Sequence, residues 1–381
     1  MCQLSRRKSP VLWCAERPRL FPAKCLMNQA QAANISERPR LELPSMFAEY
    51  RAGIGAALRE TLDKDRPAFD LLRYYMGWVD PQGNPAAGTE GKYVRPTLCL
   101  FSCEAVGGSR ENAMPAAAAL ELIHNFSLIH DDIQDRDETR HHRMTLWALW
   151  GIPKALVAGN VLRIVADSTL DDLQSAGVPP SRVISVVNQL TNAYIEMIEG
   201  QYLDIYFEGQ SEIRLKQYLD MIARKTGALI RCAFTIGAVI GSPDANKDAA
   251  SFKESGRALG FIFQVRDDIL GIWGDERSTG KPVGADIRRK KNSFPAVYAM
   301  SAAKGADKRR LLDIYRKDEP NDADVEDVLH IMDGLGVREH AHILAVDEGE
   351  AAIEALASVE MDARARQEYK NLVEFLLYRE H

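Results

Sequence analysis

Long stretches from Met46 onward carry apolar residues every three to four positions, which is the period of an α-helix with one buried face. The alternation of apolar and polar residues that indicates a β-strand is hard to find. The sequence therefore predicts an all-α protein, a bundle of about ten or more helices around a central cavity. The helical stretches are residues 46–64, 67–79, 95–108, 111–135, 153–173, 181–207, 215–241, 248–273, 294–304, 337–360 and 363–381.

Two segments within these stretches, 114–123 and 227–241, are apolar on nearly every side. Helices of that kind belong in the middle of a bundle, where they can wall a cavity. Neither reaches the ~18 consecutive apolar residues of a membrane-spanning helix, and the second contains Arg231. We therefore expect a soluble, cytoplasmic protein without a transmembrane segment.

The chain of 381 residues is 46% hydrophobic and 27% charged, an ordinary balance for a soluble protein with a large core. Residues 1–45 contain eight Lys and Arg against three Asp and Glu, and the remainder contains 40 against 51. We expect residues 1–45 to be a disordered extension, or an upstream segment ahead of a functional start at Met27 or Met46, and residues 46–381 to form a single all-α domain. The acidic body argues against a nucleic-acid partner.

The six cysteines include no CxxC pair and no histidine–cysteine cluster at metal-ligand spacing, which argues against a structural zinc site. Cys99 and Cys103 stand four positions apart in an apolar helix, and we interpret them as small buried thiols. The whole pattern is typical of a reducing cytoplasm.

Two aspartate pairs, Asp131-Asp132 and Asp267-Asp268, each end a long apolar stretch. A carboxylate in an apolar wall is costly without a compensating cation, so the two pairs together predict one shared site for divalent metal. The alternative for a single motif of this kind is an acidic helix end at the protein surface.

The first pair belongs to the longer motif DDIQD. Asp131 and Asp135 lie one turn and roughly 6 Å apart on one helix face, which His124 shares. Both carboxylates can therefore reach Mg²⁺ ions that bridge the oxygens of a diphosphate.

The second pair is placed similarly, because Gln264 and Asp268 are also one turn apart. Gly271, however, stands where a third acid would complete the motif, and only Asp275 one turn further on could help through water. The metal interpretation is therefore weaker for this motif than for the first.

Basic residues recur at helix ends and in loops beside the acidic motifs. A single one is usually a solvated charge, but arginine forks match phosphate oxygens and lysine offers a point charge. Their recurrence predicts a phosphate-bearing substrate. The residues are Lys92, Arg95, Arg140, Arg143, Lys225 and Lys281.

These motifs carry a resemblance to a known family. In order and spacing, the chain is similar to the trans-isoprenyl diphosphate synthase (polyprenyl synthetase) family, in its bacterial short-chain, farnesyl/geranylgeranyl diphosphate synthase-like branch. The resemblance implies an isoprenoid-synthase-type bundle and a homodimer. The matching segments are GKYVRP at 91–96, DDIQD at 131–135, EGQ at 199–201, KT at 225–226 and the run from FQVRDD to NSFP at 263–295.

The resemblance also implies an activity, a prenyltransferase that condenses isopentenyl diphosphate with an allylic prenyl diphosphate to give a C15–C20 product. Three Mg²⁺ ions per site would be held by Asp131, Asp132, Asp135, Asp267 and Asp268, which with Lys225 form the implied catalytic set. Isopentenyl diphosphate would be bound by Lys92, Arg95, His124 and His141. The allylic diphosphate would be held by Arg140, Lys225, Thr226, Gln264 and Lys281.

Four positions depart from the family pattern. His141 replaces the second of two adjacent arginines, so this contact to isopentenyl diphosphate becomes weaker and pH-dependent. Met144 replaces a usual proline, Asn160 a usual aspartate and Gly271 the third acid of the second motif. Together these departures bear on whether condensation is the activity.

Product length is implied by the residues just before the first motif, Phe126 and Ser127. In the family, an aromatic side chain five positions before the first aspartate resembles a floor that stops elongation. Phe126 then predicts a short product, whereas the alternative is ordinary packing of Phe126 in the core.

Two other functions remain open at the level of sequence. A terpene synthase on the same fold would ionise a prenyl diphosphate and cyclise or quench the cation without condensation. A noncatalytic partner subunit would resemble the family but lose its aspartate motifs. Lys92, Arg95 and His124 count against the first alternative, and the retained aspartates count against the second.

Overall fold

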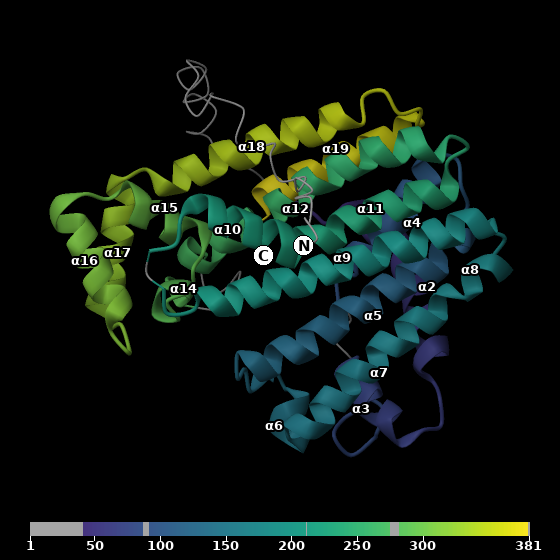
Figure 1. Cartoon of the computed structure of the whole chain (residues 1–381), viewed down its shortest axis with the longest axis horizontal. Helices are drawn as coiled ribbons and strands as arrows, with labels where there is room; N and C mark the ends of the chain where they lie inside the picture. The colour runs from purple at the N-terminus through teal and green to yellow at the C-terminus, as the bar shows by residue number, and fades with distance from the viewer. Residues whose placement is uncertain (1–40, 87–90, 211, 275–281, 380–381) are drawn as a thin grey trace, which may run out of the picture. The chain divides into compact units, whose positions relative to one another are not determined.

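Helices make up nearly all of the described chain (Figure 1). The computed structural model describes residues 41–86, 91–210, 212–274 and 282–379, and the fold is that of one compact unit, Glu42–His381. The predicted all-α bundle of more than ten helices is confirmed. Of the extension predicted for residues 1–45, residues 1–40 lie outside the described residues.

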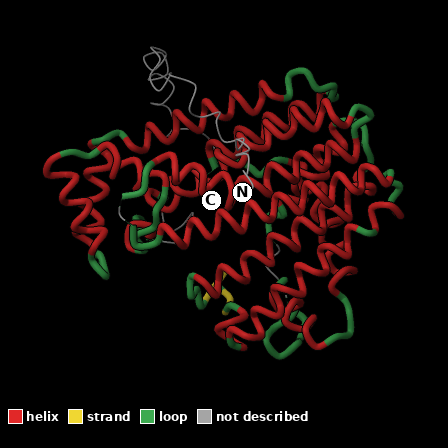
Figure 2. Tube along the Cα trace, viewed as in Figure 1, coloured by secondary structure: helices red, strands yellow, loops and turns green. Residues whose placement is uncertain are grey.

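The first half of the unit contains the helices that carry the first acidic motif and a short hairpin (Figure 2). The two-residue strands β1 and β2 were not expected from the sequence. The elements are α2 (Ser45–Leu62), α3 (Pro67–Tyr75), α4 (Val94–Ala105), α5 (Arg110–Gln134), β1 (Thr139–Arg140), β2 (Arg143–Met144), α6 (Leu146–Trp150), α7 (Ile152–Leu170), α8 (Asp172–Ser175) and α9 (Pro180–Phe207).

The second half carries the second acidic motif and the C-terminal helices. The elements are α10 (Leu215–Ile222), the π-helix η4 (Ala223–Gly227), α11 (Ala228–Gly241), α12 (Ala245–Trp273), α14 (Ala285–Arg288), α15 (Phe294–Ala302), α16 (Gly305–Arg316), α17 (Asp322–Gly334), α18 (Val337–Ala355) and α19 (Ala363–Tyr378).

Helix α11 is the central helix that its apolar sequence predicts. It packs against α4, α9 and α12, and its one charged residue, Arg231, pairs with Glu196 of α9 at 2.5 Å. The alanine-rich part of α5 is likewise buried, which lets α4, α7 and α11 approach it closely. In the described ranges, no helix combines the length and the apolar character that crossing a bilayer requires.

The structure differs from the prediction in two places, the helix predicted for residues 215–241 and the stretch 305–334, where no helix was predicted. The stretch 215–241 is interrupted by η4, a wide turn of the kind often found at functional sites. Helices α16 and α17 were not predicted, because each offers only a few apolar residues among many charged ones. Leu311 and Val328 nevertheless anchor these helices in a core cluster with α15.

Candidate active site

The first acidic cluster lies at the C-terminal end of α5. Asp131 and Asp132 are in the last turn, and Asp135 is the C-cap residue. Burial, together with the neighbouring carboxylate of Asp135, raises the pKa of Asp131 to about 6 against the opposing effect of Lys225. Burial also raises the pKa of Asp132 to about 6. The cluster therefore holds more negative charge than its surroundings stabilise.

Lys225, in the π-helix, lies near this cluster. Its Nζ pairs with Asp204 Oδ2 of α9 at 2.5 Å and is close enough to Asp131 and Asp135 to stabilise both as anions. Gly200 makes this contact possible, because a Cβ at this position would overlap the backbone of Lys225. The EGQ motif therefore serves to seat α9 directly on the π-helix.

The β1–β2 hairpin places Arg140 beside the first cluster. Its Nε donates to Asp132 Oδ1 at 2.6 Å, while Asp132 Oδ2 is buried and has no hydrogen-bond partner. His141 and His142 form the two-residue turn and both have positive φ angles, 49° and 62°. Such a turn normally contains glycine or asparagine, so the hairpin holds strain next to the site.

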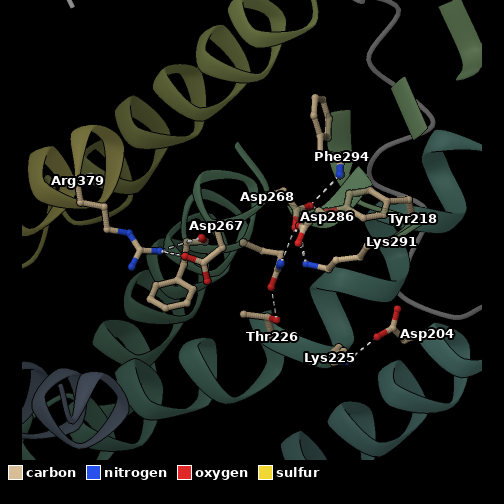
Figure 3. A network of polar contacts seen from close by, with 12 residues as sticks. Asp204, Tyr218, Lys225, Thr226, Asp267, Asp268, Asp286, Lys291, Phe294 and Arg379 are labelled. Carbon is tan, nitrogen blue, oxygen red and sulfur yellow. Dashed lines mark hydrogen bonds and ion pairs between the residues drawn. The ribbon is translucent and has the colours of Figure 1, made fainter. Parts of the chain in front are cut away.

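Asp268 of the second motif is an acceptor for four protein donors (Figure 3). It is 1% exposed. The four donors are the Tyr218 hydroxyl, Gln264 Nε2 at 3.0 Å, Lys291 Nζ at 3.2 Å and the backbone N–H of Phe294 at 2.8 Å. The last bond caps the N-terminus of α15, so Asp268 ties that helix to α10 and α12.

Asp267 has a different environment from its neighbour. Its side chain is 41% exposed and pairs through Oδ1 with the guanidinium of Arg379, which follows α19 near the C-terminus. Arg379 itself is buried and lies over the ring of Phe263. Of the two aspartates, Asp267 is the one with an open approach.

Thr226 and Gln264 link the π-helix to the second motif. The Thr226 hydroxyl donates to Gln264 Oε1 at 2.6 Å, and Gln264 Nε2 donates to Asp268. Asp204 pairs with Lys225, the residue just before Thr226, so adjacent residues of the π-helix contact the two acidic clusters. Both clusters are therefore joined to one short segment of the chain.

A cation-rich pocket adjoins the first cluster. A small cavity of about 80 Å³ is lined by Glu121, Asp132, Arg140, His141 and Arg143, among others. Its walls come from α3, α5 and the hairpin, so it opens beside the first motif.

Arg95 adds to the positive charge of this region, and His124 beside it is kept neutral. Burial lowers the pKa of Arg95 to about 10, against the opposing effect of Glu121 and Asp267, and Arg95 Nε has no acceptor. Burial and the nearby Arg95 also hold the pKa of His124 well below its ordinary value. Lys92 is exposed, and burial of its stem together with Arg379 lowers its pKa.

Phe126 and Ser127 lie one turn or more below the first acidic cluster on α5. Phe126 is buried and meets His130 edge to face, with ring centroids 4.8 Å apart. Ser127 donates to the carbonyl of His124 at 2.7 Å and shares the helix face of Asp131. Position 127 is therefore on the side of α5 that faces Lys225, and position 126 is turned toward α7.

The donor set suits a hard divalent cation. Asp131, Asp135 and Asp204 share a single ammonium group, that of Lys225, which leaves an excess of carboxylate oxygens. Among the described residues, no three metal-binding side chains already surround one point. Mg²⁺ is commonly bound by one or two carboxylates together with substrate phosphate oxygens, so this arrangement fits Mg²⁺ bound with a diphosphate.

Several residues of the network were missed by the sequence analysis, and Lys281 lies outside the described residues. Asp204 had a signal, because it stands one turn after Gly200 of the EGQ motif. Tyr218, Lys291 and Arg379 contact the second aspartate pair from other elements of the fold, which spacing along the chain does not reveal. The missed residues are Tyr75, Glu121, Asp204, Tyr218, Asp286, Lys291 and Arg379.

An all-helical bundle with two aspartate motifs in one network defines an enzyme of the isoprenoid-synthase fold. Residues 79–332 match the family model described as polyprenyl synthetase. The chain is 33% identical over 332 residues to the (2E,6E)-farnesyl diphosphate synthase of Mycobacterium tuberculosis, covering 86% of this chain and 90% of that protein. It is 36% identical over 259 residues to the geranylgeranyl diphosphate synthase of the same organism, covering 68% and 73%.

Among solved structures, the polyprenyl synthetase from Streptomyces coelicolor A3(2) matches with a TM-score of 0.80 and 36% identity, over 87% of this chain and 98% of that one. The chain belongs to the polyprenyl synthetase family, and it is a prenyltransferase.

Proposed function

We propose that the enzyme condenses isopentenyl diphosphate with an allylic prenyl diphosphate in a Mg²⁺-dependent reaction that yields a C15–C20 trans-prenyl diphosphate. The observation that carries the proposal is the π-helix that joins the two acidic motifs, where Lys225 pairs with Asp204 beside Asp131 and Thr226 is linked through Gln264 to Asp268. Two acidic motifs with an ammonium group beside each, Lys225 at the first and Lys291 at the second, suit one diphosphate and its metal ions.

The roles of the residues follow from their positions. Bound Mg²⁺ would be held by Asp131, Asp135 and Asp267 and would neutralise the charge that develops on the leaving diphosphate. Lys225 and Arg140 would contact the same diphosphate, while Thr226 and Gln264 fix the π-helix against Asp268. The metal role predicted for Asp132 and Asp268 remains a prediction.

The second substrate fits the cation-rich pocket. Arg95 offers a buried N–H without an acceptor, and Arg140, His141 and Arg143 line the adjoining cavity. A diphosphate in this pocket would satisfy those donors, and a terpene synthase would not need them. The buried apolar residues of α5 and α11 would keep water from the allylic cation, and the departing diphosphate would accept the proton lost at the end.

The short product length is proposed from Phe126 and Ser127. Ser127 lies one turn below Asp131 on the same face of α5, and the ring of Phe126 is turned toward α7, where it would border the path proposed for the growing chain. Phe126→Ala should then shift the products to longer chains in the same assay. An unchanged product distribution would leave Phe126 as a core residue only.

We also infer a homodimer, because apolar side chains are exposed on two helices that both pack on α5. Of the thirteen large hydrophobic residues found exposed in the described chain, ten lie on α7 and α9. A second copy would bury this surface. The molecular mass in solution, measured by light scattering, tests this inference, and a monomer at micromolar concentration would contradict it.

Product analysis tests the proposed reaction itself. The protein would be incubated with Mg²⁺, isopentenyl diphosphate and each allylic diphosphate from C5 to C20. We expect diphosphates longer by C5 units, none of which form without isopentenyl diphosphate. Hydrocarbons released from an allylic diphosphate alone would instead establish a terpene synthase.

A further inference from the structure

Tyr74, near the C-terminal end of α3, contacts the β1–β2 hairpin in two ways. The guanidinium of Arg143 lies over its ring, with 4.2 Å between Cζ and the ring centroid, and its hydroxyl donates to the carbonyl of Met144 at 2.8 Å. Trp150 of α6 meets the same ring edge to face, with centroids 4.9 Å apart, and Tyr74 is buried. A fixed aromatic side chain therefore holds β2 at both of its residues.

The register of the hairpin carries this support to β1. Arg143 pairs with Arg140 across the two strands, so the two side chains lie on the same face and their like charges repel. Each guanidinium has its own partners. Arg140 donates to Asp132, while Arg143 donates to the carbonyl of Val79 at 2.9 Å and lies over the ring of Tyr74. The partners of Arg143 therefore keep it apart from Arg140.

The same residues line the cation-rich pocket. Tyr74, Arg140 and Arg143 all contribute to its wall. A guanidinium matches phosphate oxygens only in a defined orientation, and a side chain that is already held in that orientation loses less entropy when the ligand binds. An aromatic face attracts a guanidinium without neutralising it, so Arg143 is held in place and keeps its charge for a ligand.

Resting on the proposed function, we propose that Tyr74 is a positioning residue for isopentenyl diphosphate, which holds Arg143 in the pocket and away from Arg140. The ring supports the guanidinium, and the hydroxyl fixes the strand that carries it. Tyr74 acts through Arg143, so the effects of changing the two residues should depend on each other.

The test measures KM separately for the two substrates by steady-state kinetics. Tyr74→Leu removes ring and hydroxyl and should raise the KM for isopentenyl diphosphate at least about tenfold. The KM for the allylic diphosphate should change by less than about twofold, because Arg140 keeps its bond to Asp132. Tyr74→Phe keeps the ring over Arg143 and should raise the first KM by only about two- to fourfold. This second variant preserves the packing, so it tests the proposal even if Tyr74→Leu does not fold.

A double-mutant cycle separates positioning from a general loss of structure. Arg143→Gln should raise the KM for isopentenyl diphosphate as well, and Tyr74→Leu/Arg143→Gln should raise it no further than the larger of the two single changes. Single effects that multiply in the double variant would overturn the proposal. So would an unchanged KM for isopentenyl diphosphate in either folded Tyr74 variant, an equal rise in both KM values, or equal effects of leucine and phenylalanine.

The matched control is Tyr50→Leu, which removes another buried tyrosine with the same two contacts. Arg110 lies over the Tyr50 ring at 5.0 Å, and the hydroxyl donates to Glu104 at 2.5 Å. This variant should lower the melting temperature and leave both KM values unchanged, and a raised KM for isopentenyl diphosphate here would overturn the assignment to Tyr74. If the wild-type protein forms no longer diphosphate from isopentenyl diphosphate, the proposed function fails instead.

Discussion

The two acidic motifs look alike in sequence but are used differently in the fold. At the first motif, four carboxylates, those of Asp131, Asp132, Asp135 and Asp204, are paired with only two cations, Lys225 and Arg140. At the second, Asp268 already has four protein donors. The first motif therefore has more carboxylates than cations, as its proposed metal role requires, while Asp268 of the second motif holds helices together.

Burial explains how one residue type takes both roles. A buried carboxylate that accepts several hydrogen bonds is stabilised as an anion and fixes its surroundings. A buried carboxylate beside other carboxylates is instead destabilised as an anion, and burial raises the pKa of Asp131 accordingly. A site that must bind a cation during each catalytic cycle needs the second kind of environment.

The largest effect is expected from removing the structural aspartate. Asp268→Ala leaves the Tyr218 hydroxyl and the N–H of Phe294 buried without their acceptor, and it leaves Lys291 with Asp286 alone, which should lower the free energy of unfolding by about 3–5 kcal/mol. Urea denaturation measures this loss. The matched control, Asp267→Ala, removes a carboxylate that is 41% exposed and leaves the buried Arg379 the carbonyl of Phe263 as an acceptor, so it should cost less, about 1–2 kcal/mol. Equal losses of unfolding free energy in the two variants would show that Asp267 and Asp268 contribute equally to stability, which would contradict a structural role for Asp268 alone.

The next effect concerns catalysis at the first motif. Asp131→Asn should lower kcat at least about a hundredfold, roughly 2.7 kcal/mol in activation free energy, because an amide neither binds Mg²⁺ well nor carries its charge. Steady-state kinetics with saturating Mg²⁺ measures the change, and circular dichroism checks the fold. Asp220→Asn, which removes a carboxylate paired with Arg224, is the control and should retain activity. Near-normal turnover in Asp131→Asn would remove that residue from the site.

Asp131→Asn, which should lower activity, should raise the stability of the protein at neutral pH without metal. In the folded protein the pKa of Asp131 is about 6, above the ordinary value of 3.8, so the folded state prefers the protonated form. The stability that this preference contributes is present at low pH and is lost as pH rises through 6. At pH 7.5 without metal, Asp131→Asn should therefore be more stable than wild type, on the order of 1–2 kcal/mol.

Thermal melts of both proteins across the pH range test this sign. The stability difference should shrink as pH falls from about 6 toward 4, because wild-type Asp131 becomes protonated and resembles asparagine. His124, whose folded pKa is depressed, contributes acid sensitivity to both proteins and cancels in the difference. A difference that does not change with pH would mean that Asp131 is not destabilised by burial.

Much of the fold could be predicted from local pattern alone. The apolar runs of α5 and α11 identified the central helices, since a helix without a polar face must be buried. Helices α16 and α17 were missed because their few apolar residues meet a core that other helices complete. The interruption at η4 was missed too, because a single wide turn changes no residue type that a pattern could reveal.

Part of the candidate site could likewise be predicted from the sequence and part could not. The one-turn spacing of Asp131 and Asp135 was visible in the sequence, because residues four apart always share a helix face. The pairing of Asp267 with Arg379 was not, since 112 positions separate the two residues. Which of two adjacent aspartates is exposed depends on such distant partners, and the two motifs therefore looked more alike in sequence than they are in the structure.

The smallest expected effect concerns the hairpin that follows the first motif. His142 has a φ angle of 62°, a conformation that costs a residue with a side chain about 1–2 kcal/mol and costs glycine almost nothing. His142→Gly should therefore raise the free energy of unfolding by about 0.5–1 kcal/mol, after allowance for the greater entropy of glycine in the unfolded chain. His142→Ala is the matched control, because it removes the imidazole but keeps the strain, and should bring no gain. A loss of stability in both variants would show that the imidazole itself holds the hairpin. If glycine stabilises the protein and leaves the kinetics unchanged, the strained turn has no part in substrate binding. If glycine instead raises the KM for isopentenyl diphosphate, the strained turn fixes the orientation of Arg140, whose Nε donates to Asp132 at 2.6 Å.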